Sequence, residues 1–309
     1  MITILKNTEA GLTVLPEPIS SCWINVIDPT PEEIARLQSW DVPAEYVTYP
    51  LDLDERARVE REDGQLLIIL RIPYFQGENV DIPYTTIPLG IILTDKYIVT
   101  VCKKENEITQ EFASGRVKAL STAKRNRFIL RLLLSTANRY LCHVREINKI
   151  VERLEDQLQR STRNREVLEL LKYQKSLTYY TTALRSNELM MERLERSQFF
   201  KTHPDDEDLL EDVLTENQQA IEMTNIAGNI LSQMMDAFAS IISNNLNAVM
   251  KMLASITIVL SLPTMIASFY GMNVGLPFQD TPMAFILIVG LSFVISAATI
   301  YIFIKRDWF

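Results

Sequence analysis

Charge is missing from two long parts of this sequence. Residues 252–279 and 281–304 contain no Asp, Glu, Lys, Arg or His, and Asp280 alone carries a charge between them. A helix that crosses a bilayer needs roughly 20 mostly apolar residues, so each stretch is long enough to span a membrane. Because two such stretches in succession are rare in soluble domains, a buried helical hairpin is the weaker interpretation.

Cysteine and histidine are also scarce. The three cysteines, Cys22, Cys102 and Cys142, are odd in number and far apart, which fits packing thiols in a reducing cytosol rather than a disulfide framework. The two histidines, His143 and His203, have no cysteine near them at ligand spacing. This pattern argues against a soft zinc site.

Other functional signals are absent as well. The sequence has 31 Lys and Arg against 39 Asp and Glu, a balance that argues against a nucleic-acid partner and is compatible with attracting cations. We find no nucleotide-binding motif and no nucleophile–base set, so we expect neither an enzyme nor a nucleotide or organic cofactor. No long apolar region follows the N-terminus, so insertion into the membrane is expected to depend on the C-terminal spans.

The basic residues that flank the spans predict their orientation. Lys251 precedes the first span, Lys305 and Arg306 follow the second, and the loop between the spans has no Lys or Arg. The positive-inside rule then predicts a multi-pass protein of the inner (plasma) membrane with both termini in the cytoplasm. Trp308 beside this basic tail is typical of an interfacial anchor.

Residues 1–120 are predicted to form a cytosolic α/β domain. Short β-rich runs alternate there with turn signals such as Asp63-Gly64. The expected strands are Met1–Leu5, Cys22–Ile27, Leu66–Ile72, Thr85–Leu93 and Tyr97–Cys102. A helix is expected to begin at Pro31, with Thr30 as its N-cap and Glu33 three residues after the cap.

The remaining soluble part is predicted to be helical. Residues 121–203 read as a long helical hairpin, because apolar residues recur there at spacings of three and four and residues 121–197 contain no glycine or proline. Residues 204–270 read as one stalk helix with an acidic first turn, which continues into the first span at about residue 252. The expected segments beyond it are a loop at 271–282, the second span at 283–304 and a basic tail at 305–309.

One face of the first span is small or hydroxylated along most of its length. Its residues recur at spacings of three and four: Asn247, Met250, Ala254, Thr257, Ser261, Thr264 and Ser268. Such a face suits either a helix that lines water or a helix that packs closely on its neighbours, and periodicity alone does not separate the two.

The tetrapeptide Tyr270-Gly271-Met272-Asn273 at the end of this span resembles the signature of the CorA family of divalent-cation channels. The other matching segments are Asn247–Lys251 before the membrane, Leu262–Ser268 in the first span, Lys305-Arg306-Asp307-Trp308 in the tail, and Leu51–Arg58 with Leu66–Pro73 in the N-terminal domain. The resemblance covers most of the chain. Together with its position at the outer end of the span, the signature favours pore lining for the small and hydroxylated face.

The resemblance implies a funnel-shaped homopentamer that conducts Mg²⁺, Co²⁺ or Ni²⁺ inward, driven by the membrane potential and closed by internal Mg²⁺. Gly271, Met272 and Asn273 would form the selective mouth, with amide oxygens accepting hydrogen bonds from the waters of the ion. We expect Gly271 to leave the helix with a positive φ and Met272 to pack rather than coordinate. Met250 and Leu253 resemble the hydrophobic constriction of the family.

The regulatory site is implied by resemblance alone. Asp212 and Asp236 resemble acidic stalk residues of the family, which would bind regulatory Mg²⁺ between neighbouring cytosolic domains. Carboxylate oxygens suit this hard cation.

The sequence departs from the family pattern at two places. Ser261 stands where many members carry a bulkier apolar residue. The loop lacks the glutamates common in Mg²⁺ channels, and its Val274–Pro277 segment resembles the zinc-transporting branch, ZntB. Three hypotheses therefore stay open: a Mg²⁺ channel, a ZntB-like zinc transporter, and a membrane-tethered helical sensor or scaffold.

Overall fold

A computed structural model describes residues 1–8, 11–117, 120–160, 164–197, 199, 204–277, 282–306 and 308. The predicted turn between the hairpin helices, His203 and Asp280 fall wholly or partly outside these residues. The chain divides into two compact units, Met1–Gln233 and Met234–Phe309, which are described separately.

The first unit is built on a seven-stranded sheet in the order β2-β1-β3-β7-β6-β5-β4. The strands are β1 Ile2–Thr8, β2 Gly11–Leu15, β3 Cys22–Ile27, β4 Arg58–Glu62, β5 Gln65–Phe75, β6 Tyr84–Leu93 and β7 Tyr97–Cys102. The pair β3–β7 is parallel and the other pairs are antiparallel. The antiparallel group β2-β1-β3 and the antiparallel meander β4-β5-β6-β7 therefore meet at one parallel seam.

A chain of buried polar side chains crosses this seam. The indole Nε1 of Trp23 donates a hydrogen bond to Oγ1 of Thr100 at 2.8 Å, and that hydroxyl donates to Oδ1 of Asn25 at 2.9 Å. All three residues are buried. Because each buried polar group has a partner, the seam carries specific hydrogen bonds as well as apolar packing.

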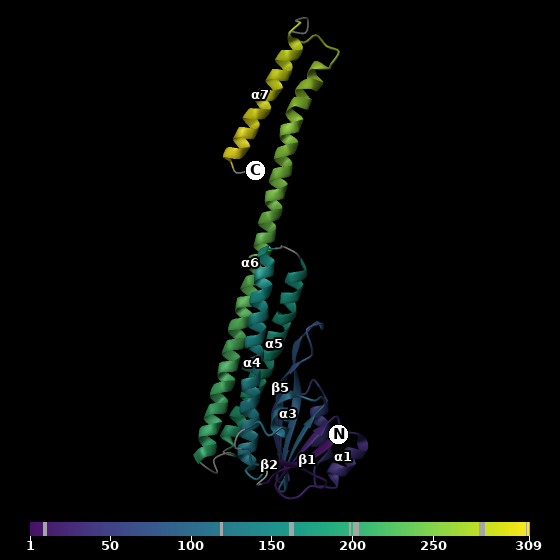
Figure 1. The fold of residues 1–309 in the computed structure, drawn as a ribbon, viewed down its shortest axis with the longest axis vertical. Helices are drawn as coiled ribbons and strands as arrows, with labels where there is room; N and C mark the ends of the chain where they lie inside the picture. Colours follow the sequence, from purple (N-terminus) through teal and green to yellow (C-terminus); the bar gives the residue numbers. More distant parts are fainter. Residues whose placement is uncertain are drawn as a thin grey trace. The chain divides into compact units, whose positions relative to one another are not determined.

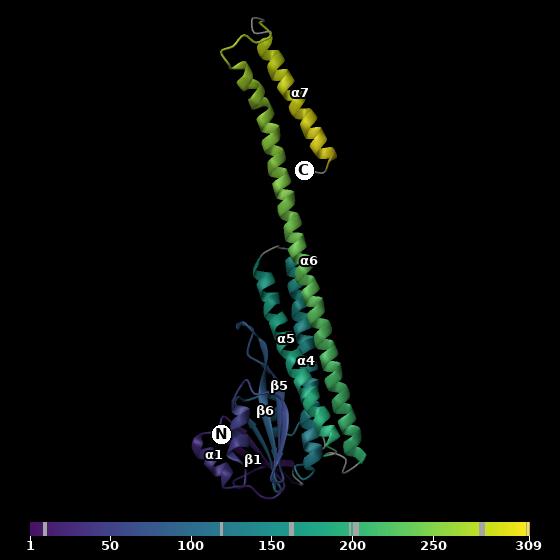
Figure 2. The same cartoon turned by 180° about the vertical axis from the view of Figure 1, so that it is seen from behind.

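The alternation of side chains along the strands gives the sheet two apolar faces. One face, with Leu67 and Ile69, packs against α1 Pro31–Gln38, α2 Ala44–Thr48 and the 3₁₀ turn Tyr49–Leu51. The predicted start of α1 is confirmed, since Thr30 and Glu33 form a complete capping box. Figures 1 and 2 show α1 on the opposite side of the sheet from α4 and α5.

The other face, with Leu66 and Ile68, is covered by longer helices. These are α3 Glu107–Ala113, α4 Arg125–Arg160, α5 Asn164–Arg196 and the beginning of α6 Pro204–Tyr270. The side chain of Asn187 on α5 is completely buried and bonds to both the N–H and the C=O of Arg71 on β5, at 2.9 and 2.8 Å. This pairing fixes the position of α5 along the sheet.

His143 of α4 lies in a cluster of aromatic side chains with Tyr84, Tyr140 and Tyr180. Its Nδ1 lies 2.6 Å from the hydroxyl of Tyr180, and its side chain is almost fully buried. Burial, with the nearby charge of Arg139, lowers the pKa of His143 to about 4. His143 is therefore a neutral core residue at physiological pH.

A buried ion pair holds the start of α6 against α4. Nε of Arg127 lies 3.0 Å from Oδ1 of Asp206, whose side chain is only 6% exposed. Leu210 and Val213, one and two turns further along α6, are part of the same core as the sheet. The first turns of α6 are thus packed inside the soluble unit.

The second unit contains the rest of α6 and helix α7, Ala284–Lys305, which lie side by side in Figures 1 and 2. Both helices are long and apolar enough to cross a membrane. The predicted fold class is confirmed: an N-terminal α/β domain, long helices and two apolar C-terminal spans. The short elements β2, β4, α2 and α3 were not predicted.

Candidate ion pathway

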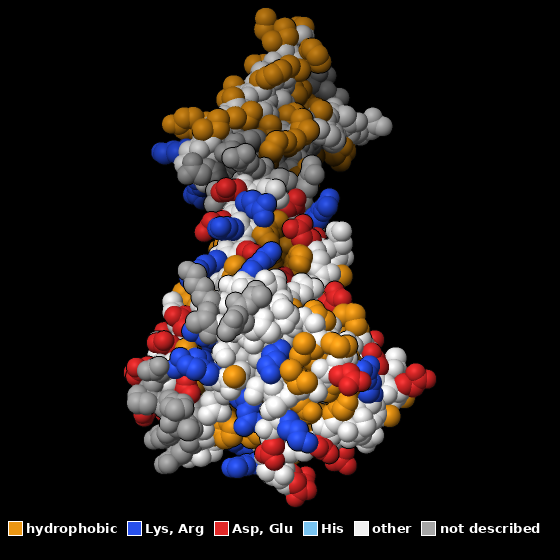
Figure 3. All heavy atoms as spheres, turned by 60° about the horizontal axis from the view of Figure 1, so that its bottom comes forward, with side chains coloured by type: hydrophobic (Ala, Val, Ile, Leu, Met, Phe, Trp, Pro, Cys, Tyr) orange, Lys and Arg blue, Asp and Glu red, His pale blue; other side chains and the backbone are white. Residues whose placement is uncertain are grey.

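The two spans present apolar surface on most sides. In Figure 3 hydrophobic side chains dominate the surface of the spans, whereas charged side chains are spread over the soluble unit. Phe285, Phe293 and Val294 of α7 and Leu260 of α6 are all more than 60% exposed. Apolar surface of this extent fits contact with lipid or with other chains.

The side of α6 that faces α7 is identified by burial. Ser255 is completely buried, and Val259, Leu262, Pro263 and Ile266 are partly buried at helical spacing. On α7, Ser292 is the buried residue, and its hydroxyl and that of Ser255 each donate to a carbonyl of their own helix at 2.8 Å. Small hydroxylated residues allow the two helices to approach closely.

The predicted pore-lining residues lie on the opposite side of α6 from α7. Their members, all exposed in the single chain, are Asn247, Met250, Leu253, Ala254, Thr257, Ser261, Thr264 and Ser268. At 3.6 residues per turn, they centre about half a turn around the helix from Ser255. The second span therefore leaves this face uncovered.

The hydroxyl groups of Thr257, Ser261 and Thr264 on this uncovered face are bonded within the helix. Thr257 donates to the carbonyl of Leu253 at 2.8 Å, and Thr264 donates to that of Leu260 at 2.9 Å. Their oxygens keep free lone pairs, which can accept hydrogen bonds from water. The face can thus contact a hydrated cation without leaving a donor unsatisfied.

The Gly-Met-Asn segment follows the last turn of α6. The N–H of Gly271 still donates to Ala267 at 3.0 Å, and the hydroxyl of Tyr270 donates to the carbonyl of Pro277 at 3.4 Å. Tyr270 thereby ties the beginning of the loop to a position seven residues later. Asn273 is exposed, as an amide that meets hydrated ions must be.

The predicted role of the Gly271 backbone is wrong. Gly271 is not among the glycines with positive φ, and a Cβ there would lie 3.4 Å from the oxygen of Ala267, an ordinary contact. The helix ends here without a residue in the left-handed conformation. The backbone conformation at position 271 therefore does not require glycine. Met272 is 52% exposed, so the packing expected for it does not occur within one chain.

Asp212 belongs to the first unit and Asp236 to the second, so each is described by itself. Both are exposed residues of α6. Within the described residues, no group of three or more His, Cys, Asp or Glu side chains could hold a metal ion.

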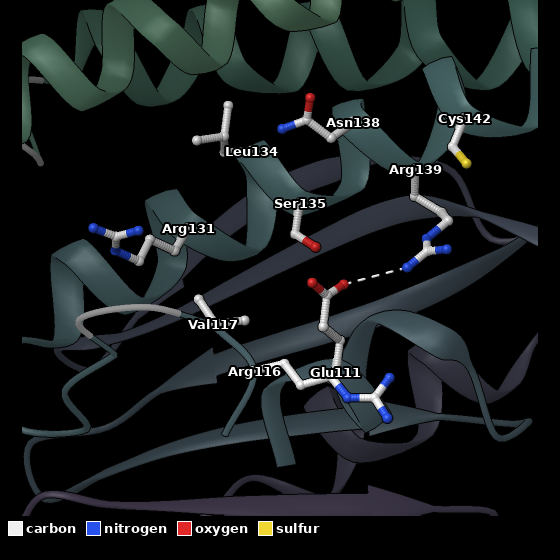
Figure 4. Close-up of a pocket in the computed structure, with 9 residues that line it drawn as sticks. All are labelled: Glu111, Arg116, Val117, Arg131, Leu134, Ser135, Asn138, Arg139 and Cys142. Atoms are coloured by element: carbon white, nitrogen blue, oxygen red, sulfur yellow. Dashed lines mark hydrogen bonds and ion pairs between the residues drawn. The ribbon is translucent and has the colours of Figure 1, made fainter. Parts of the chain in front are cut away.

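A pocket of about 490 Å³ between α3 and α4 contains none of the predicted site residues (Figure 4). Arg139 is paired there with Glu111 at 3.3 Å and with Glu107 at 2.8 Å. The guanidinium groups of Arg116 and Arg131 lie at opposite ends of the pocket. These cations do not converge on a common ligand.

Lys305 ends α7, and Arg306 caps it through its backbone N–H. Both side chains are exposed, at the same end of the spans as Lys251.

Sequence reasoning missed the contact of Tyr270 with Pro277, because a hydroxyl-to-carbonyl bond within a loop has no sequence signal.

Comparison with known proteins identifies relatives of this chain. Residues 20–306 match the model of a family described as CorA-like Mg²⁺ transporter protein. The cobalt/magnesium transport protein CorA of Methanocaldococcus jannaschii is 28% identical over 329 residues, covering all of both chains. The complete structure of a CorA magnesium transporter from that organism superposes with a TM-score of 0.87 at 24% identity, covering 100% of this chain and 99% of that one.

A weaker likeness links the chain to the zinc branch. The cytoplasmic domain of ZntB from Vibrio parahaemolyticus superposes with a TM-score of 0.57 at 15% identity, covering 78% of this chain and 98% of that domain. At this identity the likeness concerns the fold alone.

Proposed function

Because the chain belongs to the family of CorA-like Mg²⁺ transporter proteins, we propose that it is a Mg²⁺ influx channel that also admits Co²⁺ and Ni²⁺. The observation that carries this proposal is the uncovered face of α6. It is exposed from Asn247 to Ser268, lies away from α7, and leads to the exposed amide of Asn273. A helix that only anchored a sensor would gain nothing from such a face in lipid.

One such face cannot enclose a pore, so several chains must contribute. A ring of identical chains closes with cyclic symmetry and head-to-tail contacts. We propose a homopentamer, with the number five resting on the family resemblance. The first spans would line the pore and the second spans, which cover the opposite side of α6, would form the outer ring.

The proposed orientation supplies the driving force. Lys251, Lys305 and Arg306 would lie on the cytoplasmic side, with both termini, and Asn273 on the outside. An ion with two charges that moves inward gains about 4.6 kcal/mol per 100 mV of membrane potential. No nucleotide is required for influx.

Met250 and Leu253 are proposed to close the pore by excluding water from an apolar constriction. Replacing Leu253 by alanine should widen this constriction and increase the Mg²⁺ leak severalfold at high internal Mg²⁺, as measured by ion flux into liposomes. Ile256→Ala is the matched control, because Ile256 lies outside the uncovered face. An unchanged leak in Leu253→Ala would remove Leu253 from the gate.

Asp212 and Asp236 are proposed ligands of regulatory Mg²⁺ bound between neighbouring chains. Their exposure leaves them free for such contacts, and occupancy would rise with internal Mg²⁺ by mass action. In the same flux assay, Asp212→Asn should raise the internal Mg²⁺ needed for closure. Glu211→Gln, on the exposed surface one residue earlier, should not.

Mg²⁺ flux into liposomes that contain the purified protein tests the main proposal. An imposed inside-negative potential should accelerate Mg²⁺ uptake, and external Co²⁺ should compete with it. Uptake of Zn²⁺ without Mg²⁺ would favour the ZntB-like alternative, which the Val274–Pro277 segment suggests. Absence of flux for both ions would favour the membrane-tethered sensor.

A further inference from the structure

A groove with a volume of about 860 Å³ lies at the end of the spans that carries Lys251 and the basic tail. Its lining consists of Asn244, Asn247, Ala248, Val249, Met250, Lys251, Met252, Ala254 and Trp308. Three of these residues, Asn247, Met250 and Ala254, also belong to the proposed pore-lining face, so the groove extends around α6 from the side of α7 to the edge of that face. It lies entirely within the second unit. The long uncharged stretch of α6 begins at Met252, which is one of the residues that line the groove.

Trp308 reaches this groove because the tail folds back on α7. Its backbone N–H donates to the carbonyl of Phe303 at 3.0 Å, and its indole stacks on the Phe303 ring with centroids 5.2 Å apart and planes 8° apart. The indole is partly buried between α7 and α6. A tryptophan at this depth is typical of the level of lipid headgroups.

The charge of this region is positive. Lys251 is the charged residue in the lining, and Lys305 and Arg306 are exposed within three residues of Trp308. In the described part of the chain none of these three cations forms an ion pair, and the nearest described acid on α6 is Asp236. Asp307 lies outside the described residues.

We propose that this groove binds the phosphate of an anionic phospholipid. Lys251, Lys305 and Arg306 would attract the headgroup, the Asn244 amide would donate to its oxygens, and Met252 and Val249 would contact the start of the acyl chains. Basic pockets between spans are known to suit anionic headgroups. The lipid would approach from the side of α7, because Asn244, Ala248 and Lys251 lie on that side of α6 with Ser255.

Quenching of tryptophan fluorescence by brominated lipid tests this proposal on the full-length protein. Trp23 is buried in the core of the first unit and Trp40 is partly buried against it. The difference in quenching between the unmodified protein and Trp308→Phe therefore reports Trp308. At equal mole fraction, brominated phosphatidylglycerol should quench Trp308 more strongly than brominated phosphatidylcholine. Each cation removed should lower this preference about fivefold.

The variants Lys251→Gln and the triple Lys251→Gln, Lys305→Gln, Arg306→Gln should therefore lose the preference progressively. Lys149→Gln, at an exposed lysine of the soluble unit, should keep it. Equal quenching by the two lipids in the unmodified protein, or an unchanged preference in the triple variant, would overturn the proposal. Displacement of the lipid by millimolar inorganic phosphate would assign the groove to free phosphate and would overturn it as well.

Discussion

Replacing Asn273 by alanine should reduce Mg²⁺ flux into liposomes at least tenfold, while the protein still folds and inserts. Mg²⁺ gives up its waters reluctantly, so the mouth must hold the ion through its hydration shell. An amide oxygen accepts hydrogen bonds from these waters but binds weakly enough to release the ion, which conduction requires. Alanine has no acceptor in its place. Asn273 is exposed, so the substitution leaves no cavity in the chain.

Two further variants separate this role from a general effect on the loop. Val274→Ala changes the exposed neighbouring side chain and should keep normal flux. Asn273→Asp should lower the Mg²⁺ concentration at half-maximal flux and also lower the maximal flux, because a carboxylate holds a divalent cation more tightly. Full flux in Asn273→Ala would show that the amide is not part of the mouth.

Replacing Asp206 by alanine should have the largest effect on the stability of the soluble unit. The carboxylate is buried and lies 3.0 Å from the guanidinium of Arg127, whose side chain is 22% exposed. Removal of one partner from a buried ion pair costs about 3–5 kcal/mol. Hydrogen exchange on the full-length protein should show the first turns of α6 losing protection by two to three orders of magnitude.

The control for this variant is Glu207→Ala. Glu207 lies in the same acidic first turn but is exposed, so its loss reports only the interaction with the helix dipole, about 0.3–1 kcal/mol. The double variant Asp206→Leu, Arg127→Met should recover much of the loss, because it removes both charges together. Equal effects of Asp206→Ala and Glu207→Ala would contradict a specific role for the ion pair.

The sequence predicts those parts of the fold that have strong periodic patterns. The central strands are nearly continuous runs of β-branched and apolar residues, and the two spans are free of charge, so both classes were identified. The edge strands β2 and β4 were missed because each has only five residues, and because β4, Arg-Val-Glu-Arg-Glu, is largely charged. Asp206 shows a second limit: its sequence neighbours suggest a solvated acid, and only the fold brings Arg127 to it.

Less of the candidate ion pathway than of the fold could be predicted from the sequence. Helical spacing identified the hydroxylated face of α6, but which side of the helix α7 covers depends on packing between the spans. The positive φ expected at Gly271 was wrong, because a helix can end without a left-handed residue when the following amides bond to earlier carbonyls. Ligands contributed by another chain leave no pattern within one sequence.

The parallel seam of the sheet has a consequence for how the soluble unit folds. The three strands β2-β1-β3 and the meander β4–β5–β6–β7 each form from contacts near in sequence, whereas the pairing of Cys22 with Tyr97 closes a long loop. Loop closure must be achieved before any contact across the seam stabilises it, which slows folding. We therefore expect the two halves to form early and to join late, when the hydrogen bonds that link Trp23, Thr100 and Asn25 close the seam.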